Sequence, residues 1–380
     1  METAYGIDPR TGQGIAIEIA AGKIVSIKPH ENVPQRYISA GLIDLQVNGF
    51  LGYDLNAEDV GATVLLALCE ELASVGVTSW LPTLITASEQ FLLQALEIIA
   101  KAKRGHWLVA EMVCGVHIEG PSVSYMDGPR GAHPLAHVRP PSIAEFNRWQ
   151  EASGDLVRLV TLAPEQAGAI DYIRHLSSHD VHVALGHTAA SPEQVHAAAE
   201  AGARLSTHLG NGAAAILPRH PNFIWAQLAD DRLTATFIVD GWHLPPDTFK
   251  AMLRAKGMDH SVLVSDTVAL AGMPPGIYDQ PIGGHVEVSP EGRIGVAGTP
   301  YLAGASLPLS ANVAIAIEMA GLSLADALRF ATENPGRFVD DRGRLEVGAR
   351  ADLFTFEWSA GARRLAVLET WVHGEKVDHA

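Results

Sequence analysis

Three side chains at the ends of apolar runs could together hold a divalent metal ion. Glu119 lies near the end of the run 113–120, and His187 and His208 close the runs 181–187 and 203–208, each just before a loop. One carboxylate and two imidazoles suit a zinc-like ion, and three protein ligands leave a fourth position open to water, as in catalytic sites. We therefore predict one divalent metal ion per chain, with Zn2+ as the expected ion and Fe2+ or Co2+ as alternatives.

A chance arrangement is the alternative, because the chain has 17 histidines and some of them must fall near strand ends. A single histidine would therefore carry little weight. The same pattern occurs at three strand ends and a fourth time at 261–266, where an apolar run leads into Asp266. This repetition favours a metal site over coincidence.

Asp266 is the candidate for the proton transfers. Hydrolysis at a metal needs a group that takes a proton from water and later returns it to the leaving group. A carboxylate directly after a strand could instead cap a helix, but a position at the end of the eighth run favours the catalytic role. His133, in the loop after Glu119, could polarise a carbonyl as charge develops on its oxygen, although an ordinary loop histidine would look the same.

Several further polar residues are candidates for substrate contacts. Asn211 and Gly212 follow the third metal ligand and offer amide and backbone donors. Arg219 provides a local positive charge, and His243 follows the seventh run. Gln46, near the end of the first run, could orient water or a substrate group, although a buried, satisfied amide is a close alternative. A loop that merely turns and a solvated surface arginine are the competing interpretations of Gly212 and Arg219.

Eight strand-like runs alternate with helical stretches, which is the pattern of a parallel barrel. The runs are 42–47, 77–81, 112–118, 156–162, 181–185, 204–207, 233–239 and 262–265. The stretches between them, such as 60–75, 89–103 and 191–201, are amphipathic and rich in alanine. Because catalytic groups gather at the carboxyl ends of barrel strands, the sequence predicts an α/β protein with a (β/α)8 TIM-type barrel.

The two ends of the chain depart from this alternation. Short strands at 15–20 and 24–27 predict a hairpin, and 351–356 and 367–377 are again short strands bounded by turn residues. We expect both ends to pair into one small β-sandwich. The expected division is 1–39 and 347–380 for the two parts of the sandwich and 40–346 for the catalytic barrel.

Composition narrows the classes of partner. The chain carries 27 Lys and Arg against 43 Asp and Glu, a formal charge of −16, which disfavours nucleic acids and anionic membranes. Cys69 and Cys114 lie in apolar surroundings and are expected to be reduced core residues. No signal peptide or membrane-spanning run is evident, so a cytoplasmic location is the default expectation.

The sequence resembles the N-acetylglucosamine-6-phosphate deacetylase family of the amidohydrolase superfamily over almost the whole chain. The matching motifs lie at 40–49 (AGLIDLQVNG), 116–121 (VHIEGP), 130–134 (RGAHP), 161–165 (TLAPE), 186–188 (GHT), 207–209 (THL), 240–243 (DGWH) and 334–337 (NPGR). The resemblance implies a mononuclear metal on Glu119, His187 and His208. It implies that Asp266 acts as base and then acid, and that His133 assists the carbonyl.

The resemblance also implies a small-molecule amino-sugar substrate and a homodimer in which the neighbouring subunit supplies part of the phosphate site. The implied substrate contacts are Asn211, Gly212, Arg219 and His243. Binuclear hydrolases on this scaffold carry His-x-His after the first strand and often a carboxylated lysine. Because Gln46 stands at the first of these positions and no lysine occurs between 103 and 250, we expect no second metal site.

Departures from the family fall on the substrate side. Where the family has Asn-Ala-Met after the second histidine ligand, this chain has Asn-Gly-Ala at 211–213. The segment 298–304 adds bulk over the sugar, through Tyr301 and through Leu302, which we expect to contact the substrate. These loops leave the hydrolytic groups intact and bear on substrate choice.

We therefore expect a metal-dependent amidohydrolase that converts N-acetylglucosamine 6-phosphate to glucosamine 6-phosphate and acetate. The first alternative is a deacylase for another N-acyl compound, such as an unphosphorylated sugar or an N-acetyl amino acid. The second is a non-catalytic barrel that serves as a scaffold. A decayed site should lose its ligands and base first, which disfavours the scaffold.

Overall fold

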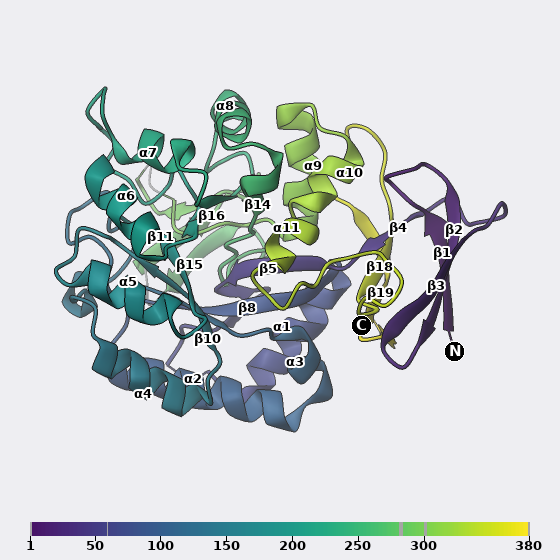
Figure 1. Cartoon of the computed structure of the whole chain (residues 1–380), viewed down its shortest axis with the longest axis horizontal. Helices are drawn as coiled ribbons and strands as arrows, with labels where there is room; N and C mark the ends of the chain where they lie inside the picture. The colour runs from purple at the N-terminus through teal and green to yellow at the C-terminus, as the bar shows by residue number, and fades with distance from the viewer. Residues whose placement is uncertain (1, 59, 281–283, 300–301, 379–380) are drawn as a thin grey trace.

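The computed structural model describes residues 2–58, 60–280, 284–299 and 302–378. It contains an eight-stranded parallel barrel with helices around it, and a smaller sheet at one side that holds both ends of the chain (Figure 1). The barrel strands are β5 (Leu42–Val47), β8 (Val77–Ile85), β9 (Val116–Glu119), β10 (Val157–Leu162), β11 (His182–Leu185), β12 (Leu205–Ser206), β13 (Thr234–Phe237) and β14 (Ser261–Leu263). The predicted fold class is confirmed.

The barrel closes between its first and last strands. Each of the other neighbours pairs in parallel in chain order, with β5 and β14 at the two edges of the sheet. Across this seam, the Asp266 backbone N–H donates to the Gln46 carbonyl at 2.9 Å, and Val47 forms a parallel bridge with Thr267. The residue proposed as the base therefore stands in the seam that closes the barrel.

The helices cover the outside of the barrel. They are α1 (Ala62–Ser74), α2 (Glu89–Gly105), α3 (Trp107–Met112), α4 (Ile143–Ser153), α5 (Ala169–Ser177), α6 (Pro192–Ala201), α7 (Phe223–Ala229), α8 (Pro246–Lys256), α9 (Leu309–Ala320), α10 (Leu324–Arg329) and α11 (Glu333–Gly336), with short 3-10 turns at Leu135–His137 and Met258–His260. Ser191 begins α6 with a reciprocal capping box to Gln194, and proline occupies the first turn.

One strand prediction needs correction. The expected strand at 112–118 begins only at Val116, because Trp107–Met112 forms helix α3. Leu108, Val109 and Met112 are all buried, and this three-to-four-residue spacing is helical rather than extended. The apolar residues of α3 therefore cover the barrel from outside, and of the segment between α3 and Val116 only Val113 forms an isolated parallel bridge, with Trp80 of β8.

Both chain ends form one mixed sheet, as expected for the small sandwich. Its strands are β1 (Glu2–Ile7), β2 (Gly14–Ala20), β3 (Lys23–Pro29), β4 (Tyr37–Ala40), β18 (Leu353–Glu357), β19 (Ala366–Val372) and β20 (Glu375–Val377). Ile17 and Ile24 from one end share a buried core with Leu353 and Trp371 from the other. From this shared core we propose 1–39 and 347–380 as one domain and 40–346 as the other.

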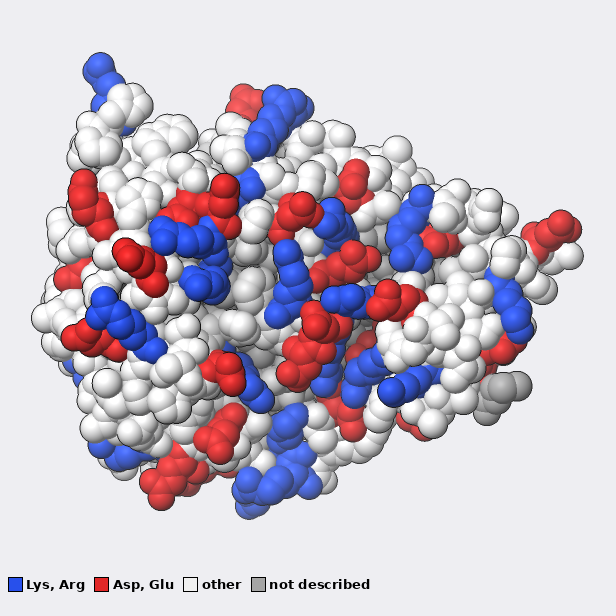
Figure 2. All heavy atoms as spheres, viewed as in Figure 1, with Lys and Arg blue, Asp and Glu red and all other residues white. Residues whose placement is uncertain are grey.

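Charged side chains tie this sheet to the barrel. The Arg350 guanidinium contacts Glu111 of α3 and Asp352, each at 2.7 Å, and Arg342 donates to the Glu111 carbonyl at 2.7 Å. On the face shown in Figure 2, acidic and basic side chains alternate between the two parts of the molecule and form no broad basic area among the described residues. The junction is thus held by paired charges.

A small antiparallel sheet, not predicted from the sequence, lies between β14 and α9. Its strands are β15 (Gly276–Gln280), β16 (Gly284–Val288) and β17 (Ile294–Val296). Val286, Val288 and Ile294 pack on Leu270, which follows the eighth barrel strand. A two-stranded ribbon, β6 (Gly49–Phe50) with β7 (Tyr53–Asp54), follows the first barrel strand. Both elements stand at the carboxyl ends of the barrel strands.

The state of the two cysteines and the lengths of the helices also bear on the expectations from the sequence. Cys69 is buried and Cys114 partly buried, and both are unpaired. Among the described residues, no helix combines the length and the apolar character needed to cross a membrane.

Candidate metal centre and active site

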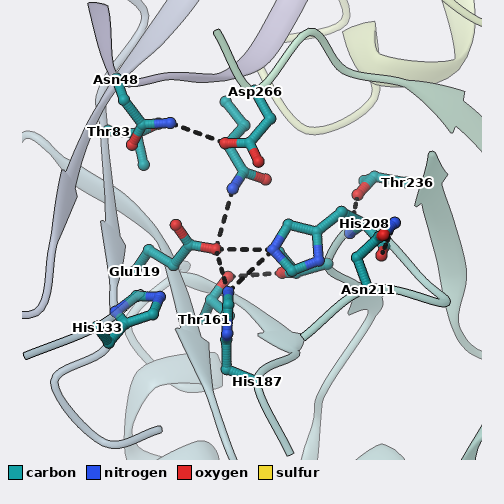
Figure 3. Close-up of polar contacts among 12 residues, drawn as sticks. Asn48, Thr83, Glu119, His133, Thr161, His187, His208, Asn211, Thr236 and Asp266 are labelled. Carbon is teal, nitrogen blue, oxygen red and sulfur yellow. Dashed lines mark hydrogen bonds and ion pairs between the residues drawn. The ribbon is translucent and has the colours of Figure 1, made fainter. Parts of the chain in front are cut away.

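The three predicted metal ligands and the predicted base meet at one end of the barrel. Glu119 is the last residue of β9, and His187 and His208 each lie two residues beyond β11 and β12. Asp266 follows the end of β14. Figure 3 shows their side chains converging from these separate strands. The structure thus brings these four positions together at the carboxyl ends of the strands.

Three of these residues adopt a left-handed backbone conformation, which is rare for residues other than glycine. The φ angles are +50° at His187, +29° at His208 and +50° at Asp266. Such strain persists only where surrounding contacts enforce it, and it often marks functional sites. At His208 the backbone N–H donates to the Thr236 hydroxyl at 2.7 Å. The turn at each strand end thus directs the side chain into the site.

The ligand atoms of Glu119, His187 and His208 form a compact triangle. Glu119 Oε1 lies 3.0 Å from His208 Nε2 and 3.3 Å from His187 Nε2, and the two Nε2 atoms are 3.1 Å apart. Ligands at about 2.0–2.2 Å from a tetrahedral zinc lie about 3.3–3.6 Å from one another. The triangle therefore fits a divalent cation closely.

The protonation of His187 supports this assignment. Its Nδ1 lies 3.0 Å from the Pro129 carbonyl, which can only accept a hydrogen bond, so Nδ1 carries the proton and Nε2 presents a lone pair. Lone pairs converging on Glu119 Oε1 at this distance repel one another unless a cation lies among them. Holding the second ring nitrogen of a ligating histidine on a carbonyl is a common feature of metal sites.

A second set of possible ligands overlaps the first. Glu119, His133 and His187 also have ligand atoms within 4.8 Å of one another. The triangle that includes His208 is tighter, with all three separations at or below 3.3 Å, which makes His208 the better candidate for the third ligand. His133 stands beside this triangle, its ring 4.2 Å from that of His187.

Two glycines allow the surrounding loops to close on His187. Gly131 and Gly212 have φ angles of +59° and +55°, and a Cβ on either would lie 3.2 Å or 2.8 Å from the His187 ring. A side chain at either position would be strained and would press on the metal ligand. Gly212, predicted as a substrate contact, thus also packs against the metal site.

The charges of the site separate the roles of its two carboxyl groups. Burial alone would raise the pKa of Glu119, but the adjacent His187 and His208 imidazoles lower it well below its usual range. Burial, and then the charge of Glu119, raises the pKa of Asp266 to about 7. Two carboxyl groups whose pKa values differ in this way suit different chemical roles. Glu119 stays ionised as a ligand, and Asp266 can take up and return a proton near neutral pH.

His133 is neutral and positioned by a hydroxyl. Burial lowers the pKa of His133 to about 3. Its Nδ1 lies 2.8 Å from the Thr86 hydroxyl. When Thr86 donates to Nδ1, Nε2 carries the proton and can donate to a substrate oxygen. Thr86 was not identified from the sequence, since nothing local links it to a loop 47 residues away.

The site opens into a cavity of about 250 Å3. Its wall contains the three metal ligands, Asp266, His133 and four of the predicted substrate contacts, namely Asn211, Gly212, His243 and Leu302. Gln280 and Val286 of the small antiparallel sheet complete one side. Pro300 and Tyr301, in the segment expected to add bulk, lie outside the described residues.

Two predicted substrate contacts do not line this cavity. Gln46 lies behind the metal ligands, where its side-chain amide donates to Glu119 Oε1 at 3.0 Å. Arg219 is exposed on the segment between β12 and α7 and is absent from the cavity wall. Among the described residues, the wall contains no lysine or arginine.

The His243 side chain is fixed on the substrate side of the cavity by hydrogen bonds with Asp240. Its Nδ1 lies 2.7 Å from Asp240 Oδ2, and both side chains are buried. Asp240 Oδ1 also accepts the backbone N–H groups of Trp242 and His243 at 2.8 and 2.9 Å. With Nδ1 engaged, Nε2 of His243 is the nitrogen left to meet a substrate.

Asn48 is a site residue that the sequence reasoning missed. It lines the cavity, and its side-chain amide donates to Asp266 Oδ1 at 2.7 Å. A signal was present, because residues two apart on a strand point to the same side. Asn48 therefore shares the side on which Gln46 was already a candidate.

Comparison with known proteins agrees with this site. The chain matches the model of the amidohydrolase family over residues 37–377. It is 34% identical over 367 residues to an N-acetylgalactosamine-6-phosphate deacetylase of Escherichia coli, covering 94% of this chain and 93% of that one. It is 32% identical over 318 residues to an N-acetylglucosamine-6-phosphate deacetylase of Bacillus subtilis, covering 82% and 78%.

The fold comparison points to the same group. The crystal structure of N-acetyl-D-glucosamine-6-phosphate deacetylase from Mycobacterium smegmatis superposes with a TM-score of 0.85 at 30% identity, covering 96% of each chain. The corresponding structure from Thermotoga maritima gives a TM-score of 0.84 at 28% identity, covering 100% of this chain and 99% of that one. The chain therefore belongs to the amidohydrolase family, in the N-acetylglucosamine-6-phosphate deacetylase group that its motifs indicated.

Proposed function

We propose that this protein hydrolyses the acetamide of N-acetylglucosamine 6-phosphate to glucosamine 6-phosphate and acetate. The observation that carries the proposal is the ligand triangle of Glu119, His187 and His208 beside Asp266, a carboxyl of raised pKa, in one cavity wall. Relatives with this named activity cover most of the chain. The 4-epimer, N-acetylgalactosamine 6-phosphate, is the second candidate, because a relative named for it is 34% identical.

Glu119, His187 and His208 would hold the metal ion, for which we propose Zn2+. When bound, a divalent ion supplies Lewis acidity that polarises the acetyl carbonyl and acidifies a water molecule. Asp266 takes the proton of the attacking water, and His133 Nε2–H donates to the carbonyl oxygen as negative charge develops there. Asp266 then returns the proton to the amide nitrogen, and the C–N bond breaks with its electron pair passing to nitrogen.

The proposal is tested by acetate release from four compounds under identical conditions, with zinc-loaded protein. These are the two N-acetylhexosamine 6-phosphates and their unphosphorylated forms. A strong preference for a 6-phosphate is expected, and the ratio between the epimers identifies the substrate. Faster release from an unphosphorylated sugar would replace the proposal by the broader deacylase alternative.

The rate should fall in acid because Asp266 must be ionised to accept a proton. Burial and the charge of Glu119 raise its pKa to about 7, and a cation bound to Glu119 lowers that value. The acidic limb of kcat/KM against pH should therefore have its midpoint at or below about pH 7, with a slope of about tenfold per pH unit below it. Initial rates across the pH range check this, and a flat acidic limb would contradict the role of Asp266.

We propose a homodimer in which Arg219 serves the cavity of the neighbouring subunit. The cavity wall offers no lysine or arginine among its described residues, although a 6-phosphate needs a cation. Apolar side chains are exposed on segments that follow barrel strands, including Met126, Ile216 and Trp225, with Ile216 exposed by 89%. Exposed apolar side chains of this kind mark interaction surfaces. The Arg219 segment would then be covered in the dimer.

Mixing two inactive variants tests this sharing. Arg219→Ala should raise KM for the phosphorylated substrate, and Asp266→Asn should abolish turnover. In a mixed dimer, the cavity of the Arg219→Ala subunit keeps Asp266 and receives Arg219 from its partner. Random reassociation should restore about a quarter of wild-type activity at low substrate, because half the dimers are mixed and each has one complete site. No recovery would place Arg219 within its own subunit.

We further propose a cytoplasmic location. A sugar phosphate carries charge at neutral pH and does not diffuse across a bilayer, so its deacetylase must occupy the compartment in which the phosphate ester is formed. Two unpaired thiols at Cys69 and Cys114 suit a reducing compartment.

A further inference from the structure

Asn48 contacts the proposed base in the cavity wall but has no role in the proposed mechanism so far. Its side chain donates from Nδ2 to Asp266 Oδ1 at 2.7 Å (Figure 3). An ionised carboxylate can only accept a hydrogen bond, so the NH2 group of Asn48, and not its oxygen, faces Asp266. The side-chain oxygen of Asn48 must therefore point elsewhere.

That oxygen has no hydrogen-bond partner within the described part of the chain. Asn48 is 7% exposed, and its Oδ1 is buried without a hydrogen bond among the described residues. Native proteins rarely leave a buried acceptor unpaired, so a residue of the cavity wall that carries such an atom is a candidate to accept a hydrogen bond from a ligand. Asp44 Oδ2 is unpaired as well, but Asp44 does not line the cavity.

The backbone holds Asn48 in this orientation from two sides. Its N–H donates to the Thr267 carbonyl at 2.8 Å, across the seam that closes the barrel, and its carbonyl accepts the Leu55 N–H at 3.0 Å. The two polar atoms of one amide group are thus fixed beside the same carboxyl group. Because Asn48 Nδ2 is bonded to Asp266 Oδ1, a substrate atom that exchanges a proton with Asp266 would lie beside the Asn48 amide group.

The proposed reaction, on which this inference rests, brings a hydrogen-bond donor to that place. The scissile amide nitrogen carries one hydrogen, which lies in the amide plane, while the incoming proton must reach the nitrogen lone pair. We propose that Asn48 is a catalytic residue whose Oδ1 accepts the N–H of the scissile amide while its Nδ2 orients Asp266.

The contact fits the step in which the amide breaks. The proton on Asp266 moves to nitrogen, the C–N bond breaks with its electrons passing to nitrogen, and acetate and a primary amine result. Positive charge grows on nitrogen during this step, so its N–H becomes a stronger donor to Asn48 Oδ1. An interaction that strengthens toward the transition state raises kcat rather than substrate affinity.

An ester substrate separates this role from simple orientation of Asp266. The analogue carries oxygen in place of the amide NH and has no hydrogen for Asn48 to accept. Asn48→Ala should lower kcat for N-acetylglucosamine 6-phosphate by about a hundredfold and for the ester by about tenfold, with KM and bound zinc unchanged. Should the alanine variant not fold, as judged by thermal melting, Asn48→Ser gives the same comparison.

The matched control is Asn56→Ala. Asn56 also lines the cavity. Its side-chain amide donates to the Thr83 carbonyl at 3.1 Å, and its side-chain oxygen accepts the Ile85 N–H at 2.9 Å, so this oxygen already has a partner. Asn56→Ala should change kcat for the amide and for the ester by the same factor. An equal loss on amide and ester in Asn48→Ala would overturn the inference, whereas wild-type protein that hydrolyses neither hexosamine 6-phosphate would overturn the proposed function itself.

Discussion

Asp266→Asn should lower kcat by at least about a hundredfold while the protein keeps its metal, as expected for loss of a general base. Asparagine has the same shape and can still pair with Asn48, whose amide now bonds Asp266 at 2.7 Å. It cannot take a proton from water or return one to nitrogen. Both halves of the reaction therefore slow together. The measurement is kcat at saturating substrate, with zinc content determined on the same sample.

Asp44→Asn is the matched control, because it makes the same change at a second buried aspartate near the seam. Burial raises the pKa of Asp44 to about 6, and its Oδ1 accepts the backbone N–H groups of Ser265 and Gln46 at 3.1 and 3.3 Å. It does not line the cavity. An asparagine oxygen can accept the same bonds, so kcat should fall by no more than about tenfold. Near-normal turnover in Asp266→Asn would remove Asp266 as the base.

The sequence predicted those parts of the site that depend on single strands. Glu119, His187 and His208 each follow a short apolar run, and parallel barrel strands all bring their carboxyl ends to one rim. The position of each ligand could therefore be inferred without knowing its neighbours. The same reasoning placed Asp266, because its strand is the last of eight.

The parts that were missed depend on contacts between distant segments. Asn48 and Asp266 are 218 residues apart and meet only because the barrel closes between β5 and β14. Strand β1 joins its sheet through β2 and β4, and nothing in its own short sequence marks it. Arg219 was expected to contact the substrate because of its charge and the family resemblance, but the course of an exposed loop depends on what it packs against. The hydrophobic periodicity within a single segment contains no information about such contacts.

His208→Gln should abolish both metal binding and turnover. His208 Nε2 lies 3.0 Å from Glu119 Oε1 and 3.1 Å from His187 Nε2, so its removal leaves two protein ligands for the ion. Loss of a partner that merely orients a ligand costs about 10- to 100-fold in affinity, and loss of the ligand itself should cost at least about 100-fold. Zinc per subunit after gel filtration should fall from about one to near zero.

His243→Gln separates this effect from damage to the cavity. His243 is a buried histidine in the same wall, held by Asp240 at 2.7 Å and not part of the ligand triangle. Its variant should retain about one zinc per subunit, with its loss of activity expressed mainly in KM. Added zinc should raise the Tm of wild type and of His243→Gln, since an ion that binds only the folded state stabilises it, but should leave that of His208→Gln unchanged. Full zinc content in His208→Gln would transfer the third ligand to His133, the other imidazole within 4.8 Å of Glu119 and His187.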